Sequence, residues 1–284
     1  MKINNIELIE SEEKFELDQS IDLPNILSLS NLLDLQILKS PDSSNILKID
    51  NEENNFKLSD GINNYVIRNG CPILYPQLVT GAWNTNSILQ FKNYNEPLLK
   101  YVLLSQIKQS GEINAPLNSI AARKHQWRYK NFCSDLDGIV LDVGSDKPSH
   151  SIQFLPKDCK YIGLDPYAGA GEFRLIGLGE ILPIADETVN VVTFNTSLDH
   201  VLDYYTAINE AYRVLTPGGS IVIASYAWIE NATLLTDAVH FHHFRENQLL
   251  AALDGLFKTQ MIKKYEDPKH SKHRYGIYIY ATKL

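Results

Sequence analysis

Two acidic residues and one glycine stand where two consecutive buried strands are expected to end. The apolar run 138–144 ends in Asp142-Val143-Gly144, and the run 159–165 ends in Asp165, about 20 residues after the glycine. In a nucleotide-binding strand–helix–strand unit, such a glycine lets the backbone approach the ligand, and an acid at this spacing accepts hydrogen bonds from ribose hydroxyls. An ordinary strand–loop–helix connection without a ligand has the same spacing, so both interpretations stay open.

Histidines form a second group that could do chemistry. His200 follows the apolar run 190–196, and His240, His242 and His243 stand before the last expected helix. A neutral imidazole accepts a proton from a hydroxyl or an amine near pH 7, so His200 and His243 are candidate general bases. Two alternatives remain: His200 only packs at a helix start, or His240 binds a divalent metal together with His242 or His243. Spacing alone does not establish ligation, and no metal site is predicted.

Alternating strands and helices are expected to position these residues. Residues 202–215 have helical apolar spacing and end at Thr216-Pro217-Gly218-Gly219, a helix-ending and turn signal. This alternation predicts a Rossmann-like α/β fold with a mostly parallel sheet covered on both faces. The expected strands are 138–144, 159–165, 173–179, 190–196 and 220–225, with a late antiparallel pair at 259–265 and 275–282. Further helices are expected over 96–109, 117–133 and 246–256.

The composition is that of a folded protein with an acidic balance. The 284 residues include 26 Lys and Arg against 34 Asp and Glu, a net charge of −8, and 44% of the residues are hydrophobic. Such a balance disfavours a protein that mainly binds nucleic acid, because phosphate backbones are bound by clustered Lys and Arg. The three cysteines are far apart, which favours a reducing compartment and excludes a disulfide framework. We expect a cytoplasmic protein that does not span a membrane.

Three motifs after the first strand together carry a family resemblance. Residues 177–192 read GLGEILPIADETVNVV, residues 197–201 read SLDHV, and residues 207–219 read AINEAYRVLTPGG. In order and spacing, residues 138–225 resemble the class I S-adenosylmethionine-dependent methyltransferases of the type 11 group. The resemblance implies transfer of a methyl group from S-adenosylmethionine. We expect a small-molecule acceptor, a sugar or a natural-product intermediate, methylated on oxygen or nitrogen with His200 or His243 as the base.

The resemblance also implies a cofactor-binding set at the strand ends. By position, the first strand meets the methionine part, the second holds the ribose, the third borders the adenine, and the fourth faces the reacting methyl group. In chain order, the set is Asp142, Gly144, Ser145, Asp165, Pro166, Leu178, Gly179, Glu180, Asn195 and Thr196.

The chain departs from the family at two places. Residues 144–148 read GSDKP and keep only the first glycine of the usual G-x-G-x-G loop, and Leu178 replaces a common acid. These changes leave a second hypothesis open, a non-catalytic pseudo-methyltransferase that acts as an interaction protein. A third is an RNA methyltransferase. A nicotinamide-dependent dehydrogenase ranks last, because its G-x-G-x-x-G pattern is missing.

The first part of the chain has no strand–helix alternation. Residues 32–43 and 56–76 resemble Trm112-like zinc-ribbon modules, which in some proteins are fused to methyltransferases. The four metal positions hold Ser40, Ser43, Leu58 and Gly61, without a thiol, so a tetrahedral zinc site is excluded. We expect a small β-rich module over 1–90, held by packing, that serves as a lid or as a surface for a partner or for self-association. The methyltransferase domain is expected over 91–284, with a helical lead-in at 91–137.

Overall fold

The structure is a computed structural model of the 284-residue chain. It describes residues 23–52, 55–77, 127–146, 151–166, 172–234, 240–267 and 269–284. The predicted helix 96–109, most of the predicted helix 117–133 and the predicted domain boundary near residue 90 lie outside these ranges. No helix in the described ranges is long and apolar enough to cross a membrane.

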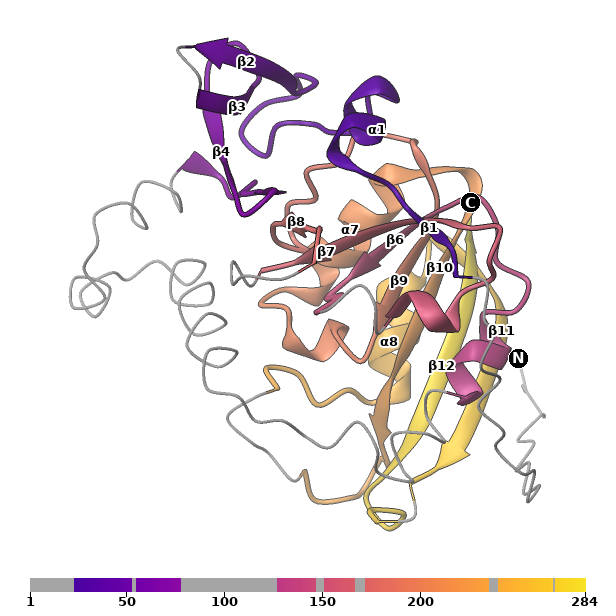
Figure 1. The fold of residues 1–284 in the computed structure, drawn as a ribbon. Helices are drawn as coiled ribbons and strands as arrows, with labels where there is room; N and C mark the ends of the chain where they lie inside the picture. The colour runs from indigo at the N-terminus through magenta and orange to yellow at the C-terminus, as the bar shows by residue number, and fades with distance from the viewer. Residues whose placement is uncertain are drawn as a thin grey trace, which may run out of the picture.

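One large sheet forms the centre of the molecule (Figure 1). Its strands run in the order β1, β7, β6, β9, β10, β12, β11, and β8 pairs with β7 beyond the end of β1. All these pairings are parallel except the two that β12 makes, with β10 and with β11. The strands are β1 (Asn25–Ile26), β6 (Ile139–Val143), β7 (Lys160–Asp165), β8 (Leu175–Ile176), β9 (Val189–Asn195), β10 (Leu215–Trp228), β11 (Phe257–Glu266) and β12 (Arg274–Lys283). The predicted fold, a mostly parallel sheet with a late antiparallel pair, is confirmed.

Two strands differ from their predicted lengths. β10 begins at Leu215, so the predicted turn at 216–219 lies within the strand and forms a bulge against β9 between Leu215 and Ser220. β8 covers only two residues of the predicted run 173–179. The chain turns after it, with the Ile181 N–H donating to the Leu178 carbonyl. Leu175, Ile176 and Leu178 of that run are nonetheless buried and Phe173 is half-buried, which explains why the pattern resembled a longer strand.

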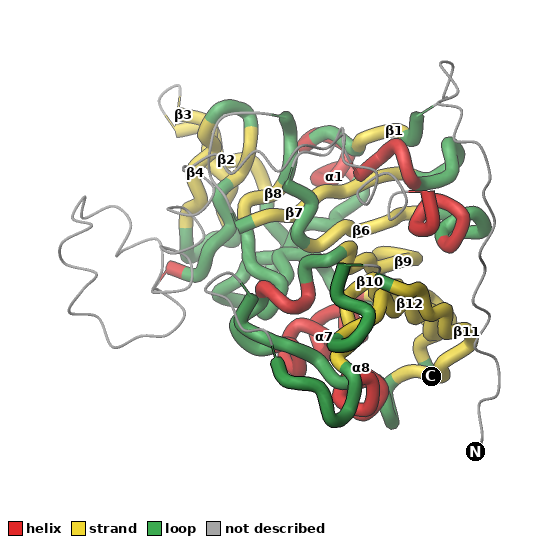
Figure 2. The backbone as a smooth tube through the Cα atoms, turned by 90° about the horizontal axis from the view of Figure 1, so that it is seen from below, coloured by secondary structure: helices red, strands yellow, loops and turns green. Residues whose placement is uncertain are grey.

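Helices and loops cover both faces of the sheet. α7 (Tyr204–Val214) and α8 (Glu246–Leu253) lie on the same face (Figure 2), and α7 buries Ala207, Ile208, Ala211 and Val214. The opposite face carries a second apolar cluster around Tyr129, Phe132 and Tyr278, built from the helical residues 127–132 and the short helix η1 (Ile152–Phe154). Burying both faces is what a parallel sheet of apolar strands requires.

The N-terminal part forms a separate antiparallel sheet and a short helix (Figure 1). The sheet has the order β2, β3, β4, β5, and the helix α1 (Leu29–Asp34) begins at the N-cap residue Ser28. The strand bounds are β2 (Lys48–Glu52), β3 (Asn55–Ser59), β4 (Asn64–Arg68) and β5 (Cys71–Pro72). We call residues 40–76 the small module. The prediction of a β-rich N-terminal region is thereby confirmed.

Two segments attach this region to the large sheet. The Ala185 N–H donates to the Ile37 carbonyl (2.7 Å), and the Lys39 N–H donates to Pro183 (3.1 Å). After β5, the Leu74 N–H donates to Ile176 in β8 (2.7 Å), so the chain continues the large sheet beyond its edge. The apolar core is therefore continuous from the N-terminal region into the large sheet.

Candidate active site

The carboxyl ends of β6, β7 and β9 meet at one edge of the sheet, because these neighbouring strands are parallel. Asp142 lies just before the end of β6 and is buried. Its carboxylate accepts hydrogen bonds from Thr193 Oγ1 and from the Tyr161 hydroxyl, both at 2.8 Å. Burial raises the pKa of Asp142. This carboxylate therefore ties β6 to its two neighbours below the turn that carries Gly144.

Gly144 begins the turn that leaves β6. Its backbone has φ +84°, and a Cβ at this position would lie 2.3 Å from Ser197 Cβ. The N–H groups of Gly144 and Ser145 both donate to the Leu164 carbonyl, at 2.8 and 3.1 Å. A side chain at residue 144 is thus excluded by backbone conformation and by contact with the chain after β9, which explains why this glycine remains while the others of the loop are replaced.

Asp165 ends β7 beside this turn and is only 2% exposed. Its carboxylate accepts a hydrogen bond from the Asp146 N–H at 2.9 Å, so it also holds the chain that follows Gly144. The next residue, Pro166, accepts a hydrogen bond at its carbonyl from the Tyr75 hydroxyl of the small module. The predicted ribose-binding acid thus lies between the turn after β6 and the small module.

Residues 178–180 follow β8, and the three side chains have different surroundings. Leu178 is buried, and a Cβ on Gly179 would lie 3.1 Å from Val143 Cγ1. Glu180 Oε1 accepts hydrogen bonds from the N–H groups of Leu202 and Asp203 just before α7, and burial raises the pKa of this carboxyl. Glu180 therefore positions the start of α7, and its place beside the adenine stays a prediction.

Asn195 and Thr196 lie at the end of β9, as predicted. Thr196 has φ +56°, a backbone conformation that is rare for a β-branched residue. It is held there by the hydrogen bond from its N–H to the Ala224 carbonyl (2.8 Å), and its hydroxyl donates to the Asn195 carbonyl. A strained residue that the neighbouring strand fixes in place is a recurring feature of functional sites.

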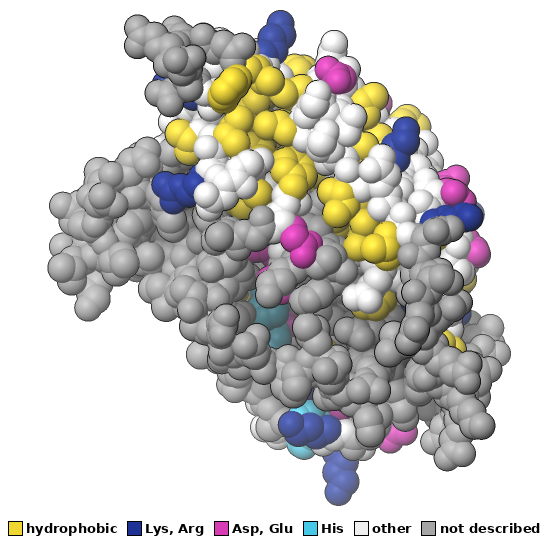
Figure 3. Space-filling view, in the orientation of Figure 1, with side chains coloured by type: hydrophobic (Ala, Val, Ile, Leu, Met, Phe, Trp, Pro, Cys, Tyr) yellow, Lys and Arg dark blue, Asp and Glu magenta, His cyan; other side chains and the backbone are white. Residues whose placement is uncertain are grey.

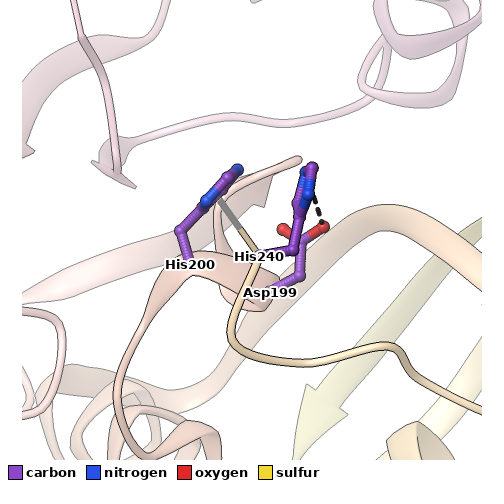
Figure 4. Close-up of side chains that lie close together, drawn as sticks. All are labelled: Asp199, His200 and His240. Carbon is purple, nitrogen blue, oxygen red and sulfur yellow. Dashed lines mark ion pairs between the residues drawn. The ribbon is translucent and has the colours of Figure 1, made fainter. Parts of the chain in front are cut away.

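Just after β9, the short helix η2 (Leu198–His200) brings an acid and histidines together. The ring centroids of His200 and His240 lie 4.4 Å apart, and His240 Nε2 is 3.8 Å from Asp199 Oδ2 (Figure 4). His243 also lies near His240, with 6.2 Å between ring centroids, and packs against Trp228. The two predicted bases, His200 and His243, are thus linked through their contacts with His240.

His242 has a different environment. Its Nε2 lies 2.9 Å from the Val201 carbonyl, and its ring stacks on Phe244. His242 therefore supports the loop rather than joining the cluster. Sequence reasoning gave no role to Asp199, although the pair Asp199-His200 directly after a buried strand was a signal that could have singled it out.

Comparison with known proteins identifies this region. Residues 141–223, which run from the last residues of β6 through β7, β9 and α7 into β10, match a family described as "Methyltransferase domain". We call the large sheet with its helices the methyltransferase domain, after this match. The match supports the resemblance of the motifs to class I methyltransferases.

Curated relatives of the methyltransferase domain share part of their length with this chain. A ubiquinone/menaquinone biosynthesis C-methyltransferase UbiE of Geotalea daltonii is 30% identical over 131 residues, 46% of this chain and 48% of that protein. An uncharacterized methyltransferase of a Mycobacterium species is 32% identical over 99 residues, 32% of this chain and 39% of that protein. The chain thus spans less than half the length of these relatives.

Solved structures share the fold of the methyltransferase domain. The N-methyltransferase NodS of Bradyrhizobium japonicum, in complex with S-adenosylhomocysteine, has a TM-score of 0.50 at 13% identity and covers 64% of this chain and 98% of its own. A 1,6-didemethyltoxoflavin-N1-methyltransferase of Burkholderia thailandensis has a TM-score of 0.50 at 14% identity and covers 79% of this chain and 96% of its own. At this identity the likeness establishes the fold alone.

The hydrogen-bond acceptors at the sheet edge of the methyltransferase domain suit S-adenosylmethionine. A carboxylate at the end of β7 can accept hydrogen bonds from two vicinal ribose hydroxyls, and Asp165 places one beside the Gly144 turn. On the adenine side, Leu178 supplies apolar surface but no acceptor for an amino group. The residues present are therefore compatible with the ribose of the predicted cofactor, and adenine recognition by backbone groups and apolar contact stays a prediction.

Proposed function

We propose that this chain transfers a methyl group from S-adenosylmethionine to an oxygen or nitrogen of a small-molecule acceptor. The observation that carries the proposal is that Asp165 ends β7 at the same edge of the parallel sheet where Asn195 ends β9, two strands away. Thr196 and His200 follow just after β9. If Asp165 binds the ribose of the methyl donor, the reactive methyl group would lie near the end of β9, which the candidate base His200 follows.

The proposed chemistry divides between the cofactor and the chain. S-adenosylmethionine supplies a methyl group on a sulfonium: the acceptor lone pair forms the new bond to carbon as the carbon–sulfur bond breaks, and that electron pair stays on sulfur. The chain aligns the two partners and excludes water. His200 or His243 accepts the proton that the acceptor hydroxyl or amine loses. Asp165 binds the ribose hydroxyls, and Asp142 keeps β6 and β9 in register.

Surface charge supports a small-molecule acceptor over a nucleic acid. On the face shown in Figure 3, the Lys and Arg side chains of the described residues stand mostly apart near its rim, and hydrophobic side chains lie between them. Binding to a phosphate backbone relies on several cations along one path. RNA binding that weakens steeply with salt would favour the RNA methyltransferase hypothesis instead.

We also propose that the small module is a Trm112-like unit in which hydrogen bonds replace zinc. Its support is the network at two of the former metal positions: Ser40 Oγ lies 2.7 Å from the Tyr65 hydroxyl, and Ser43 Oγ donates to Asp60 at 2.9 Å. The module also exposes apolar side chains, which supports a role in binding a partner protein or a second copy. These are Ile49, Phe56, Ile62 and Val66.

Calorimetric titration with S-adenosylmethionine and S-adenosylhomocysteine tests the cofactor site. We expect micromolar binding to the wild type, and a loss of about tenfold to a hundredfold in Asp165→Ala, because hydrogen bonds to a charged group contribute about 1.5–3 kcal/mol. Asp135→Ala, which removes an exposed carboxylate elsewhere, is the matched control and should bind like the wild type. If folded wild-type protein binds neither ligand, the proposal fails in favour of an interaction protein.

A further inference from the structure

Within the described ranges, one group of side chains has the composition of a metal site. Asp199, His200 and His240 each offer one ligand atom, and these atoms all lie within 4.8 Å of one another. Two of the residues come from η2 and the third from the segment before α8, so the fold brings them together. The geometry points to a divalent-cation site formed by these three residues.

The spacing of the ligand atoms supports a cation more than a direct contact. Asp199 Oδ2 and His240 Nε2 are 3.8 Å apart, too far for a hydrogen bond. Two ligands about 2.0–2.2 Å from a shared cation lie roughly 3–3.6 Å apart. Asp199 and His240 are within a few tenths of an ångström of that spacing, and the three ligand atoms, which span up to 4.8 Å, would move closer together on binding. Figure 4 shows the two imidazole rings side by side, with the Asp199 carboxylate beneath the His240 ring.

The burial of the Asp199 carboxylate is an independent reason to infer a bound cation. The residue is only 7% exposed, and its Oδ1 is buried without a hydrogen-bond partner. The ion pairs of the described chain include no Lys or Arg with Asp199. A buried carboxylate is costly unless it is paired or coordinates a metal, so a bound cation would compensate for the desolvation of Asp199.

The backbone holds the two ligand segments together without a cation. The Asp199 carbonyl accepts hydrogen bonds from the N–H groups of Phe241 (2.9 Å) and His242 (3.1 Å), and the His200 N–H donates to Ser197 (3.0 Å). His242 adds its own contact to Val201. Because both segments are fixed in this way, little chain entropy opposes ligation.

Two imidazoles and one carboxylate suit a divalent transition metal and leave coordination positions open. The His240 side chain is 32% exposed, so the open side can be reached from solvent. Resting on the proposed function, with His200 as a ligand and His243 as the remaining candidate base, the inference assigns these positions to the acceptor. An acceptor hydroxyl bound to the cation would lose its proton more readily. The acceptor class is then a hydroxyl compound.

Titration of the metal-free full-length protein with Co²⁺ tests the inference, read by calorimetry and by the visible absorption that Co²⁺ acquires on nitrogen ligation. We expect one equivalent to bind, and Asp199→Asn and His240→Ala each to weaken binding by about a hundredfold. His270→Ala, in a loop outside the cluster, is the matched control. Circular dichroism of each variant verifies folding, and a rise in the Tm with Co²⁺ in the wild type alone provides a second readout.

The outcomes separate the two proposals. No Co²⁺ binding by folded wild type, or binding that Asp199→Asn and His240→Ala leave unchanged, overturns the metal site while S-adenosylmethionine binding still supports the proposed function. Co²⁺ binding that depends on Asp199 and His240, in a protein that does not bind S-adenosylmethionine, supports the metal site and removes the methyltransferase proposal.

Discussion

Single side chains of this protein organise whole turns of the backbone. Asp60 is the clearest case, because it organises a turn of the small module next to two positions where the proposed Trm112-like resemblance would place zinc ligands. It accepts hydrogen bonds from the N–H groups of Ile62 and Asn63, at 2.8 and 2.6 Å, and from the Ser43 hydroxyl. Burial alone would raise the pKa of Asp60, but these hydrogen bonds hold it well below its usual range.

This pKa shift predicts a pH dependence of stability. Because the folded-state pKa of Asp60 lies below the unfolded value near 3.9, its contribution is fully present at neutral pH. It is lost as the pH falls from about 4 toward the folded pKa. We expect Asp60→Asn to lower the free energy of unfolding by about 1–3 kcal/mol at pH 7.

Urea unfolding of the wild type and of Asp60→Asn between pH 7 and pH 3 measures this effect. The gap between the two proteins should narrow below about pH 4, whereas Asp135→Asn, which changes an exposed carboxylate, should follow the wild type throughout. A gap that stays constant down to pH 3 would contradict the assigned role of the carboxylate charge.

Among the helices and strands, α7 connects the motif at residues 207–219 to the motif at residues 177–192. Glu210 accepts a hydrogen bond from the Leu182 N–H (2.8 Å), and Arg213 donates to the carbonyls of Leu182 (2.9 Å) and Ile184 (2.7 Å) and to Asp186. The helix thereby clamps the segment between β8 and β9. This contact explains in physical terms why the two motifs occur together in the sequence.

A second prediction concerns the contribution of the N-cap of α7 to stability. Asp203 caps the helix by accepting from the N–H groups of Tyr205 (3.0 Å) and Thr206 (3.3 Å), and the Thr206 hydroxyl also donates to it. Asp203→Ala should lower the free energy of unfolding by about 1 kcal/mol, within the range of about 0.5–2 kcal/mol for lost caps. Asp203→Asn should retain most of the stability, since Asn caps helices equally well. Equal losses in the two variants, measured by urea unfolding, would argue against a cap.

At the scale of the whole molecule, the N-terminal region and the methyltransferase domain share one core. Leu38 is fully buried where the two meet and forms a bridge with Ile184, next to the ion pair between Lys39 and Asp186 (3.0 Å). The sequence predicted separate regions at 1–90 and 91–284, and the shared core predicts that both unfold in one transition.

Leu38→Ala tests this cooperativity. Removing a fully buried leucine side chain costs about 2–5 kcal/mol. Thermal unfolding followed by far-UV circular dichroism and by tryptophan fluorescence should show one coincident transition at a lower temperature in the variant. Leu35→Ala, at an exposed position nearby, should leave the Tm nearly unchanged. Two separated transitions, with only one shifted, would mean that the regions fold independently.

The sequence by itself determined the strand–helix alternation, the parallel sheet and the positions of Gly144 and Asp165 at its carboxyl edge. Apolar runs of strand length and helical spacing record burial locally, and a strand end is marked by the residues next to it. Only the tertiary structure decided that His240 lies beside Asp199 and His200. It also decided that Ile73 and Leu74 continue the large sheet. These contacts join segments far apart in the chain through backbone hydrogen bonds, which any residue type can make and which therefore leave no pattern in the sequence.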